Sequence, residues 1–399
     1  MAGPFRFIAP ARTAALAAVL ILAWWVAAAQ FTYGGNWTGL FCTGSLFHLP
    51  SWLEQQETIL RDPAPHGYDG QIFHVMAHRP WPLCEILPYL DPPQLRYQRI
   101  LIPALAYTLA LGSQAWIDRA YFSLILLSLA AGAWWTARLA ELRGVSAWWG
   151  LAFVLLPSSL ASIDRMVVDG PLVTCVAVFA FCWETGRWRW AALLAAATPF
   201  VRETGMFLPA AAALAALLRW GLPAALKWAC AGLPFGLFSL WLSQLPGGIH
   251  ARFAGLFYSI RLLLAEPGPQ GSPAWFGQVL YWTALVALAA LLSAAAVSLV
   301  QCWRRRAECA SSPRAALWIC GALYGAAAWL ICHIEPRAAW DDFYSFGRVF
   351  SPVFLAVFLE WLACGRPLLA VALLLASAAR MALQFVSPAF RILRALAGA

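Results

Sequence analysis

The stretch "AALAAVLILAWWVAAAQ", residues 14–30, sets the architecture of the chain. It carries no charge, and Arg6 and Arg12 precede it. Its length is close to the roughly 20 apolar residues with which a helix crosses a bilayer. A cleaved signal peptide is the alternative, because "AAAQ" offers small residues for cleavage. We expect a retained first helix instead, because further apolar runs follow it.

The whole chain has the composition of a membrane protein. Of its 399 residues, 62% are hydrophobic and 11% are charged, and the mean hydropathy is +0.70. Soluble domains carry roughly 25% charged residues. Because apolar runs recur from end to end without an internal repeat, we expect a single integral membrane domain over 1–399. The net charge of +9 fits positive loops on one membrane face better than it fits nucleic-acid binding.

The apolar runs predict an all-α polytopic fold with about 11 transmembrane helices. The predicted spans are 14–30, 117–137, 147–161, 170–183, 188–200, 205–218, 226–243, 275–300, 315–333, 348–363 and 367–386. The segment "ILIPALAYTLALG", residues 100–112, is too short for a comfortable crossing, so we expect a helix at the membrane interface. Residues 31–116 then form a large first extracytoplasmic loop with interfacial helices inside it.

The distribution of charge predicts the orientation. With the N-terminus inside, the inner loops hold 13 cations and 4 acids, whereas the outer side holds 14 of each. This bias follows the positive-inside rule. If residues 100–112 crossed the membrane, the basic stretch "WRRRAEC" would face outward, so we favour the eleven-span topology.

The ten cysteines do not have the spacing of a zinc site. Two of them, Cys42 and Cys84, share the first predicted outer loop. They would pair if that loop faces an oxidising compartment. A disulfide and two free thiols are both compatible with the sequence.

Polar chemistry gathers in the predicted outer loops, above all in "HGYDGQIFHVMAHRP", residues 66–80. Gly67 and Gly70 flank Tyr68 and Asp69, which lets the backbone turn sharply and leaves the carboxylate reachable. Such a carboxylate can act as a general base or as a metal ligand. A turn with a solvated aspartate is the alternative.

Two further stretches bring acids and arginines to the same predicted face. "SIDRMVVDGPL" contains Asp164, Arg165 and Asp169, and "PFVRETGMF" contains Arg202 and Glu203. Charges at the end of a span are costly unless they are paired or wet. Local ion pairs that anchor the interface are one interpretation. The other is a cationic pocket wall oriented by acids, because the planar guanidinium fork suits phosphate.

Two more stretches have the same character. "AAWDDFYSFGRVFSP" contains Asp341, Asp342 and Arg348, and "LRYQRIL" contains Arg96 and Arg99. The paired acids could bind a divalent cation, although the aromatic residues around them are also typical of an interfacial belt. Snorkelling to lipid headgroups is the favoured interpretation of Arg96.

These stretches together resemble the GT-C superfamily of membrane glycosyltransferases, in particular bacterial members distantly similar to the phosphatidylinositol-glycan mannosyltransferases. The matching stretches are "GYDGQIFHVMA", "RYQRILIPALAYTLALG", "LPSSLASIDRMVVDGPL", "ATPFVRETGMFL" and "DDFYSFGRVFSP". The resemblance implies inverting transfer of a sugar from a polyprenyl-phosphate donor, on the outer face of the bacterial inner membrane. The implied partners are that donor, a cell-envelope glycan or lipid acceptor, and membrane lipids. His74 is a departure, because an aromatic residue often stands there in similar proteins.

The resemblance also implies roles for individual residues. It makes Asp69 the catalytic residue, as general base on the acceptor hydroxyl or as part of a metal site. The implied donor-phosphate or substrate-binding residues are Tyr68, Gln71, Arg99, Arg165, Arg202 and Arg348. The implied acidic support is Asp164, Asp169, Glu203, Asp341 and Asp342, and either Asp164 or Asp169 matches the second-loop acid of the family.

Two other functions fit parts of this pattern. A transporter or flippase of lipid-linked sugars would place ionisable residues near the bilayer midplane, and the predicted spans have almost none there. A membrane acyltransferase would use a catalytic histidine. His66, His74 and His78 are available but have no clear partner in the sequence. An enzyme on one membrane face is therefore the favoured interpretation.

Overall fold

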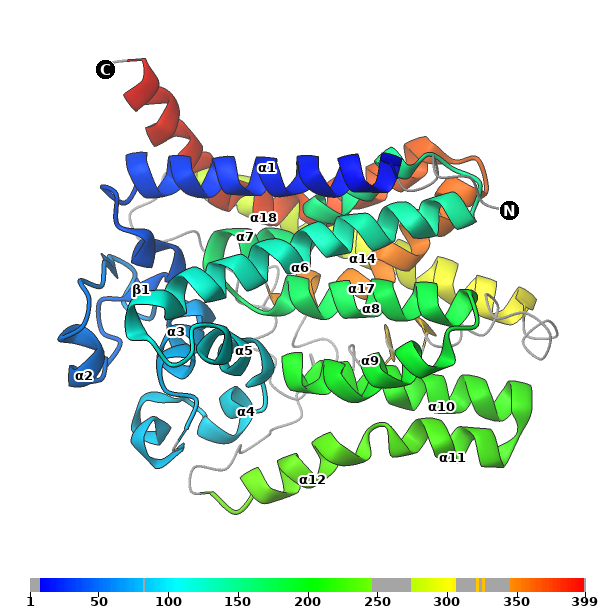
Figure 1. Cartoon of the computed structure of the whole chain (residues 1–399). Coiled ribbons are helices and arrows are strands. Elements are labelled where there is room, and N and C mark those ends of the chain that lie inside the picture. The colour runs from blue at the N-terminus through cyan, green and yellow to red at the C-terminus, as the bar shows by residue number, and fades with distance from the viewer. Residues whose placement is uncertain are drawn as a thin grey trace.

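A computed structural model describes residues 8–81, 83–245, 274–305, 321–322, 325–326 and 345–397. These residues form an all-α fold, apart from two short parallel strands, β1 (Thr43–Gly44) and β2 (Arg61–Asp62). The longest helices form one bundle (Figure 1) and are α1 (Ile8–Phe31), α6 (Gln114–Leu142), α14 (Ala274–Arg305) and α18 (Pro367–Leu396). The predicted all-α class is confirmed.

Several described helices are long and apolar enough to cross a membrane, which indicates a multi-pass membrane protein. Four qualify singly: Ala9–Phe31, Gln114–Leu142, Tyr281–Gln301 and Pro367–Leu396. Two bent helix pairs raise the number of candidate spans in the described residues to six at most. The predicted spans 14–30, 117–137, 275–300 and 367–386 fall within the four long helices.

The prediction of about 11 transmembrane helices is wrong. Three predicted spans form shorter helices, α8 (Asp169–Glu184), α9 (Trp188–Val201) and α10 (Phe207–Trp220). They contain 16, 14 and 14 residues. At 1.5 Å per residue, even α8 is roughly 24 Å long, whereas the hydrocarbon core is roughly 30 Å thick. Apolar composition alone therefore overstated the number of full crossings.

Other predicted spans are broken by proline and glycine. Residues 147–161 form the 3₁₀-helix η5 (Ala147–Leu155) and α7 (Pro157–Arg165), which are bent by 59°. Pro157 lacks a backbone N–H, so it opens a new helix more readily than it continues an old one.

The remaining predicted spans have different outcomes. Residues 226–243 form α11 (Leu222–Cys230) and α12 (Leu233–Leu242), bent by 45°. The predicted span 348–363 lies within α17 (Ser345–Ala363). The predicted span 315–333 lies almost entirely outside the described residues.

The segment between α1 and α6 gathers at one end of the bundle (Figure 1). Its helices are η2 (Trp37–Phe41), α2 (Ser51–Glu54), α3 (Asp69–His78), η3 (Leu83–Glu85), η4 (Leu87–Tyr89), α4 (Pro93–Tyr97) and α5 (Leu101–Leu109). The nine residues of α5 span roughly 13 Å, too little for a crossing. Cys42 and Cys84 are both free thiols, so of the two possibilities left open by the sequence, a disulfide or two free thiols, the structure has the second.

Two buried hydrogen bonds fasten the end of α7 and the turn that follows it to the bundle. Trp25 of α1 donates through Nε1 to the carbonyl of Ile163, at 2.8 Å. The hydroxyl of Tyr121 in α6 donates to the carbonyl of Met166, also at 2.8 Å. Because buried carbonyls need partners, these bonds fix the place at which α7 ends and α8 begins.

Candidate functional site

The backbone around Asp69 requires both glycines that flank it. Gly67 has φ +58°, in the left-handed region that glycine enters without strain. A Cβ on Gly70 would lie under 3.0 Å from the carbonyl oxygen of Arg165, at the end of α7. The sequence "GYDG" therefore presses the start of α3 against α7, and Asp69 becomes the first residue of α3.

Three arginines surround the carboxylate of Asp69. Arg96 Nη1 lies 2.6 Å from Oδ1, while Arg99 Nη1 and Arg348 Nη1 lie 3.3 and 3.4 Å from Oδ2. The Asp69 side chain is 13% exposed. Because Arg348 belongs to α17, this contact joins the first loop to the C-terminal part of the chain.

Two further acids extend the network. Glu203, in η6 (Glu203–Met206), holds Arg99 in a two-pronged contact, with Nε–Oε2 at 2.6 Å and Nη2–Oε1 at 2.8 Å. Asp169, the first residue of α8, contacts Arg202 and lies 3.6 Å from Arg348. We call this set the acid–arginine cluster: Asp69, Arg96, Arg99, Asp169, Arg202, Glu203 and Arg348.

The charges in the cluster control one another. Burial alone would raise the pKa of Asp69, but Arg96, Arg348, Arg99 and Arg202 outweigh it and hold that pKa well below its usual range. Burial opposes the arginines at Glu203 too, where they lower the pKa to about 2. Burial and the neighbouring cations lower the pKa of Arg202 to about 10. With four arginines and three acids, the cluster is suited to an additional anion.

Arg165 and Asp164 form a neighbouring group with Asp62. Arg165 Nε lies 2.8 Å from Asp164 Oδ2, and its Nη1 lies 3.9 Å from Asp62 Oδ2. Arg165 also contacts the Cys42 thiol. Here acids outnumber the cation, so positive charge is concentrated around Asp69 and negative charge around Arg165. Of the two candidates for the second-loop acid, Asp169 is the one that shares Arg348 with Asp69.

The remaining predicted site residues are Tyr68, Gln71, Asp341 and Asp342, and they do not all lie in the acid–arginine cluster. The Tyr68 ring lies 5.3 Å from the guanidinium carbon of Arg348, within range of a cation–π contact. Gln71 is buried, accepting from the Gly44 N–H and donating to the His66 carbonyl, both at 2.9 Å. The Gln71 amide therefore links the backbone at Gly44 to the backbone at His66. Asp341 and Asp342 lie outside the described residues.

Two features of the site were missed in the sequence. Arg96, interpreted as a snorkelling residue, makes the shortest contact to Asp69. His74 and His78, which had no clear partner, face Glu57 and Asp118, and one ligand atom from each residue lies within 4.8 Å of all the others. The four-residue spacing of the histidines on a helix was the available signal, because it places both on one face.

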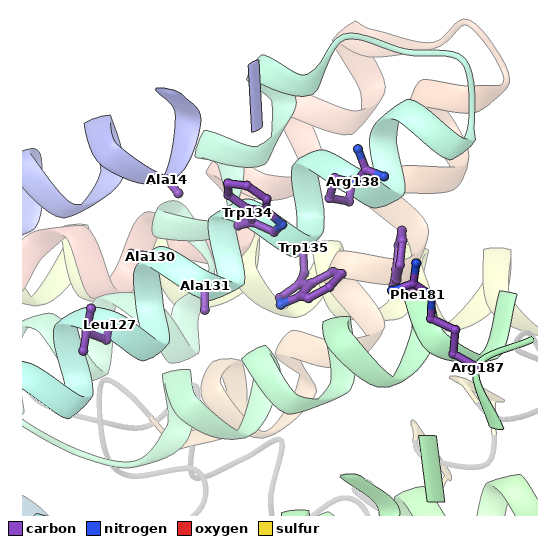
Figure 2. Close-up of a pocket in the computed structure, with 9 residues that line it drawn as sticks. All are labelled: Ala14, Leu127, Ala130, Ala131, Trp134, Trp135, Arg138, Phe181 and Arg187. Atoms are coloured by element: carbon purple, nitrogen blue, oxygen red, sulfur yellow. The ribbon is translucent and has the colours of Figure 1, made fainter. Parts of the chain in front are cut away.

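The apolar cavity in Figure 2 lies away from this chemistry. Its volume is about 510 Å³, and its lining includes Ala14, Leu127, Trp134 and Arg138. Phe181, also in the lining, follows the cluster residue Asp169 in α8 by 12 residues, roughly 18 Å along the helix axis. The cavity therefore lies toward the end of α8 opposite to the acid–arginine cluster.

The acid–arginine cluster is the described region in which buried charge from the most distant parts of the chain converges. Its function has to be argued from its own chemistry. No protein-family model matches this chain, and no curated protein or solved structure is similar enough to match it.

Proposed function

We propose that the protein is an inverting glycosyltransferase of the GT-C type. It would move a sugar from a polyprenyl-phosphate donor to a cell-envelope glycan or lipid acceptor. The observation that carries this proposal is the convergence of Arg96, Arg99 and Arg348 on the Asp69 carboxylate, within 3.4 Å. A carboxylate and several arginines at one end of a membrane bundle supply the two things this reaction needs, a base and cations for a phosphate.

The donor phosphate would bind to Arg348 and Arg202. Both contact Asp169, and the cluster that contains them has one more cation than it has acids. The lowered pKa of Arg202, at about 10, reflects burial and the repulsion of Arg348 and Arg99. A phosphate would relieve that repulsion. The polyprenyl chain would lie along the apolar helix surfaces within the bilayer.

The chemical step follows from this placement. The acceptor hydroxyl oxygen attacks the anomeric carbon of the sugar while the bond from that carbon to the phosphate oxygen breaks. The hydroxyl proton passes to Asp69, and the electron pair of the broken bond leaves with the polyprenyl phosphate. Arginines stabilise the charge that develops on the leaving phosphate. They supply positive charge of the kind that a divalent cation gives in other phosphate sites.

Binding of the donor would also activate the base. In the described arrangement the arginines hold the pKa of Asp69 far below its usual range, so its carboxylate is a weak base. A phosphate competes for the same guanidinium groups. As Arg348 turns toward it, the Asp69 carboxylate loses a stabilising cation and its pKa rises. The carboxylate therefore becomes a better base only when the donor is present.

We assign the cluster to the extracytoplasmic face of a bacterial inner membrane. Arginine-rich segments mark the inner face of a membrane. Because the charge count made with eleven spans does not apply to this fold, the orientation rests on the arginines at the opposite end of the bundle. Arg138, Arg143 and Glu184 belong to the opposite end of the bundle, at the far ends of α6 and α8. A polyprenyl-phosphate sugar presents its headgroup at such an outer surface.

A transporter of lipid-linked sugars is the second candidate, and Arg380 is the observation in its favour. Arg380 is 2% exposed, lies near the middle of α18 and is one helical turn from Gln384, whose amide oxygen lies 3.4 Å from Arg165 Nη2. A buried charge within an apolar helix is typical of a transport path. The two functions differ in their product, since a transporter moves the donor without breaking a bond.

The experiment reconstitutes the full-length protein in proteoliposomes with radiolabelled polyprenyl-phosphate sugars and an extracted envelope acceptor fraction. We expect labelled sugar to become covalently attached to the acceptor while polyprenyl phosphate is released. Replacing Arg348 by Ala should raise the donor requirement more than the acceptor requirement. Movement of intact donor across the bilayer, without any covalent product, would support transport and refute the transferase.

A further inference from the structure

A second polar group lies on α3, at the end opposite Asp69. His74 and His78 are four residues apart and share one face of the helix. That face meets Glu57, from the loop after α2, and Asp118, in the first turns of α6. Three segments that are distant in the sequence thus place two imidazoles and two carboxylates together.

Four atoms converge on a common centre. His74 Nε2 lies 2.8 Å from Glu57 Oε1 and 3.2 Å from Asp118 Oδ1. His78 Nε2 lies 3.7 Å from the same Glu57 oxygen and 3.0 Å from the same Asp118 oxygen. Ligands of a tetrahedral zinc lie roughly 3.4 Å apart. The widest separation in the group is 4.8 Å, so closure around a cation needs a shift of about 1 Å.

The orientation of His78 is fixed by Gln114. The Gln114 side-chain nitrogen donates to the His78 carbonyl at 3.4 Å, which turns its oxygen toward His78 Nδ1, at 2.7 Å. An amide oxygen only accepts, so Nδ1 carries the hydrogen. In neutral His78 the lone pair is then on Nε2, directed at a carboxylate oxygen of Asp118. Two acceptors at 3.0 Å repel each other unless a proton or a metal lies between them.

The burial of Glu57, His74 and Asp118 also requires positive charge close to the two carboxylates. His74 is fully buried, and the Phe41 ring stacks on it at 4.1 Å, so its ring plane is held in place. Glu57 and Asp118 are mostly buried as well, with side chains 23% and 19% exposed. Two carboxylates out of water need two positive charges close by. One divalent cation supplies them with both imidazoles neutral.

We propose that Glu57, His74, His78 and Asp118 bind a divalent transition-metal ion, with zinc the best match. Two imidazoles and two carboxylates are typical zinc ligands, whereas magnesium and calcium prefer oxygen alone. The contact from Gln114 to His78 is of the kind that orients metal-bound histidines. All four ligand positions come from protein side chains, which is characteristic of a structural site.

The metal would join three segments at the end of the bundle where the segment between α1 and α6 gathers (Figure 1). It would fasten the C-terminal end of α3 to α6 and to the loop that carries Glu57. Asp69 lies nine residues before His78, roughly 13 Å away along α3. The ion is therefore outside the acid–arginine cluster, and its presence does not depend on the proposed transferase activity.

The test uses full-length protein purified in detergent through a tag that contains no histidine. We expect mass spectrometry of the metal content to find close to one zinc ion per chain. His74→Gln and His78→Gln should each lower that content at least tenfold. The matched control is His66→Gln, because His66 is an exposed residue of the same stretch. This control should keep the wild-type content.

A second measurement needs no variant. Removing metal from wild-type protein with a strong chelator should lower its thermal unfolding temperature, and added Zn²⁺ should restore it. Cobalt uptake, followed by its visible absorption, reports the coordination directly. Wild-type protein that contains no metal, takes up neither zinc nor cobalt and ignores the chelator would overturn the proposal. The four side chains would then share protons instead.

Discussion

Replacing Asp69 by Asn removes the one negative charge that Arg96, Arg99 and Arg348 share, and leaves the shape of the side chain intact. Removing one partner of a buried ion pair costs roughly 3–5 kcal/mol. The Asp69 and Arg96 side chains are 13% and 19% exposed, so solvent screening places the expected loss near the lower limit, at about 3 kcal/mol. Thermal unfolding in detergent measures this loss.

The effects of Asp69→Asn on activity should separate binding from chemistry. A general base typically contributes roughly 10²–10⁴ to the rate, so the turnover number should fall at least 100-fold. The donor should bind at least as tightly as to the wild type, because its phosphate no longer competes with the carboxylate for Arg348. Radiolabelled sugar transfer gives the first quantity, and equilibrium binding of the donor gives the second.

Glu184→Gln is the matched control for lost stability. Glu184 pairs with Arg143 at 2.5 Å, both side chains are 10% exposed, and the pair lies at the far end of α8. We expect a comparable loss of stability with transfer preserved. If Asp69→Asn keeps transfer within about threefold of the wild type, Asp69 is not the base. If the variant loses donor binding as well, the competition between carboxylate and phosphate is refuted.

Four further changes test other parts of the structure. Arg348→Lys should raise the donor KM about tenfold and the acceptor KM little, because it loses one charge-assisted hydrogen bond to phosphate; equal effects would argue against a phosphate role. Gly70→Ala should destabilise the protein by about 1–3 kcal/mol, because its Cβ meets the α7 backbone, whereas Gly236→Ala, with open space around it, should not. His66→Cys, in a background without the native cysteines, should be labelled in intact cells by an impermeant thiol reagent; labelling only after the inner face is opened would invert the topology. The folded-state pKa of Glu203, about 2, lies below its ordinary value of 4.5. The carboxylate therefore stabilises the folded protein above about pH 4.5, and this contribution is lost as the pH falls toward 2. The thermal unfolding temperature should depend less on pH in Glu203→Gln than in the wild type, and an unchanged profile would contradict the assigned ion pairs.

Long, uninterrupted apolar runs were the part of the fold that the sequence predicted well. Residues 14–30 and 117–137 lie within α1 and α6, because nothing inside these runs stops a helix. The segment 147–161 has a similar composition, but Pro157 divides it into two helices at 59°. Hydropathy reports which residues avoid water and says little about where one helix ends. The number of spans was therefore overestimated where apolar runs are short or contain proline.

The candidate site was predicted in part for a similar reason. The motifs supplied Asp69, Arg202 and Arg348, but only folding brings Arg348 to Asp69 across a separation of 279 residues. Arg96 was interpreted from its position before an interfacial segment, and that position does not reveal a carboxylate on another helix. His74 and His78 had no visible partner for the same reason. Spacing along a helix predicts which residues share a face, and it does not predict what that face meets.

The placement of α3 indicates which groups move during the proposed reaction. Gly67 and Gly70 press its first turn against neighbouring backbone, and His74 and His78 hold its other end against α6. A helix held at both ends cannot carry Asp69 far, whereas an arginine side chain changes rotamer without moving the backbone. The exchange of partners between carboxylate and phosphate should therefore be made by Arg348, which contacts Asp69 and would also bind the phosphate. Donor binding would then raise the basicity of Asp69 without moving its backbone. The acceptor hydroxyl would therefore meet the carboxylate in the same place with and without the donor.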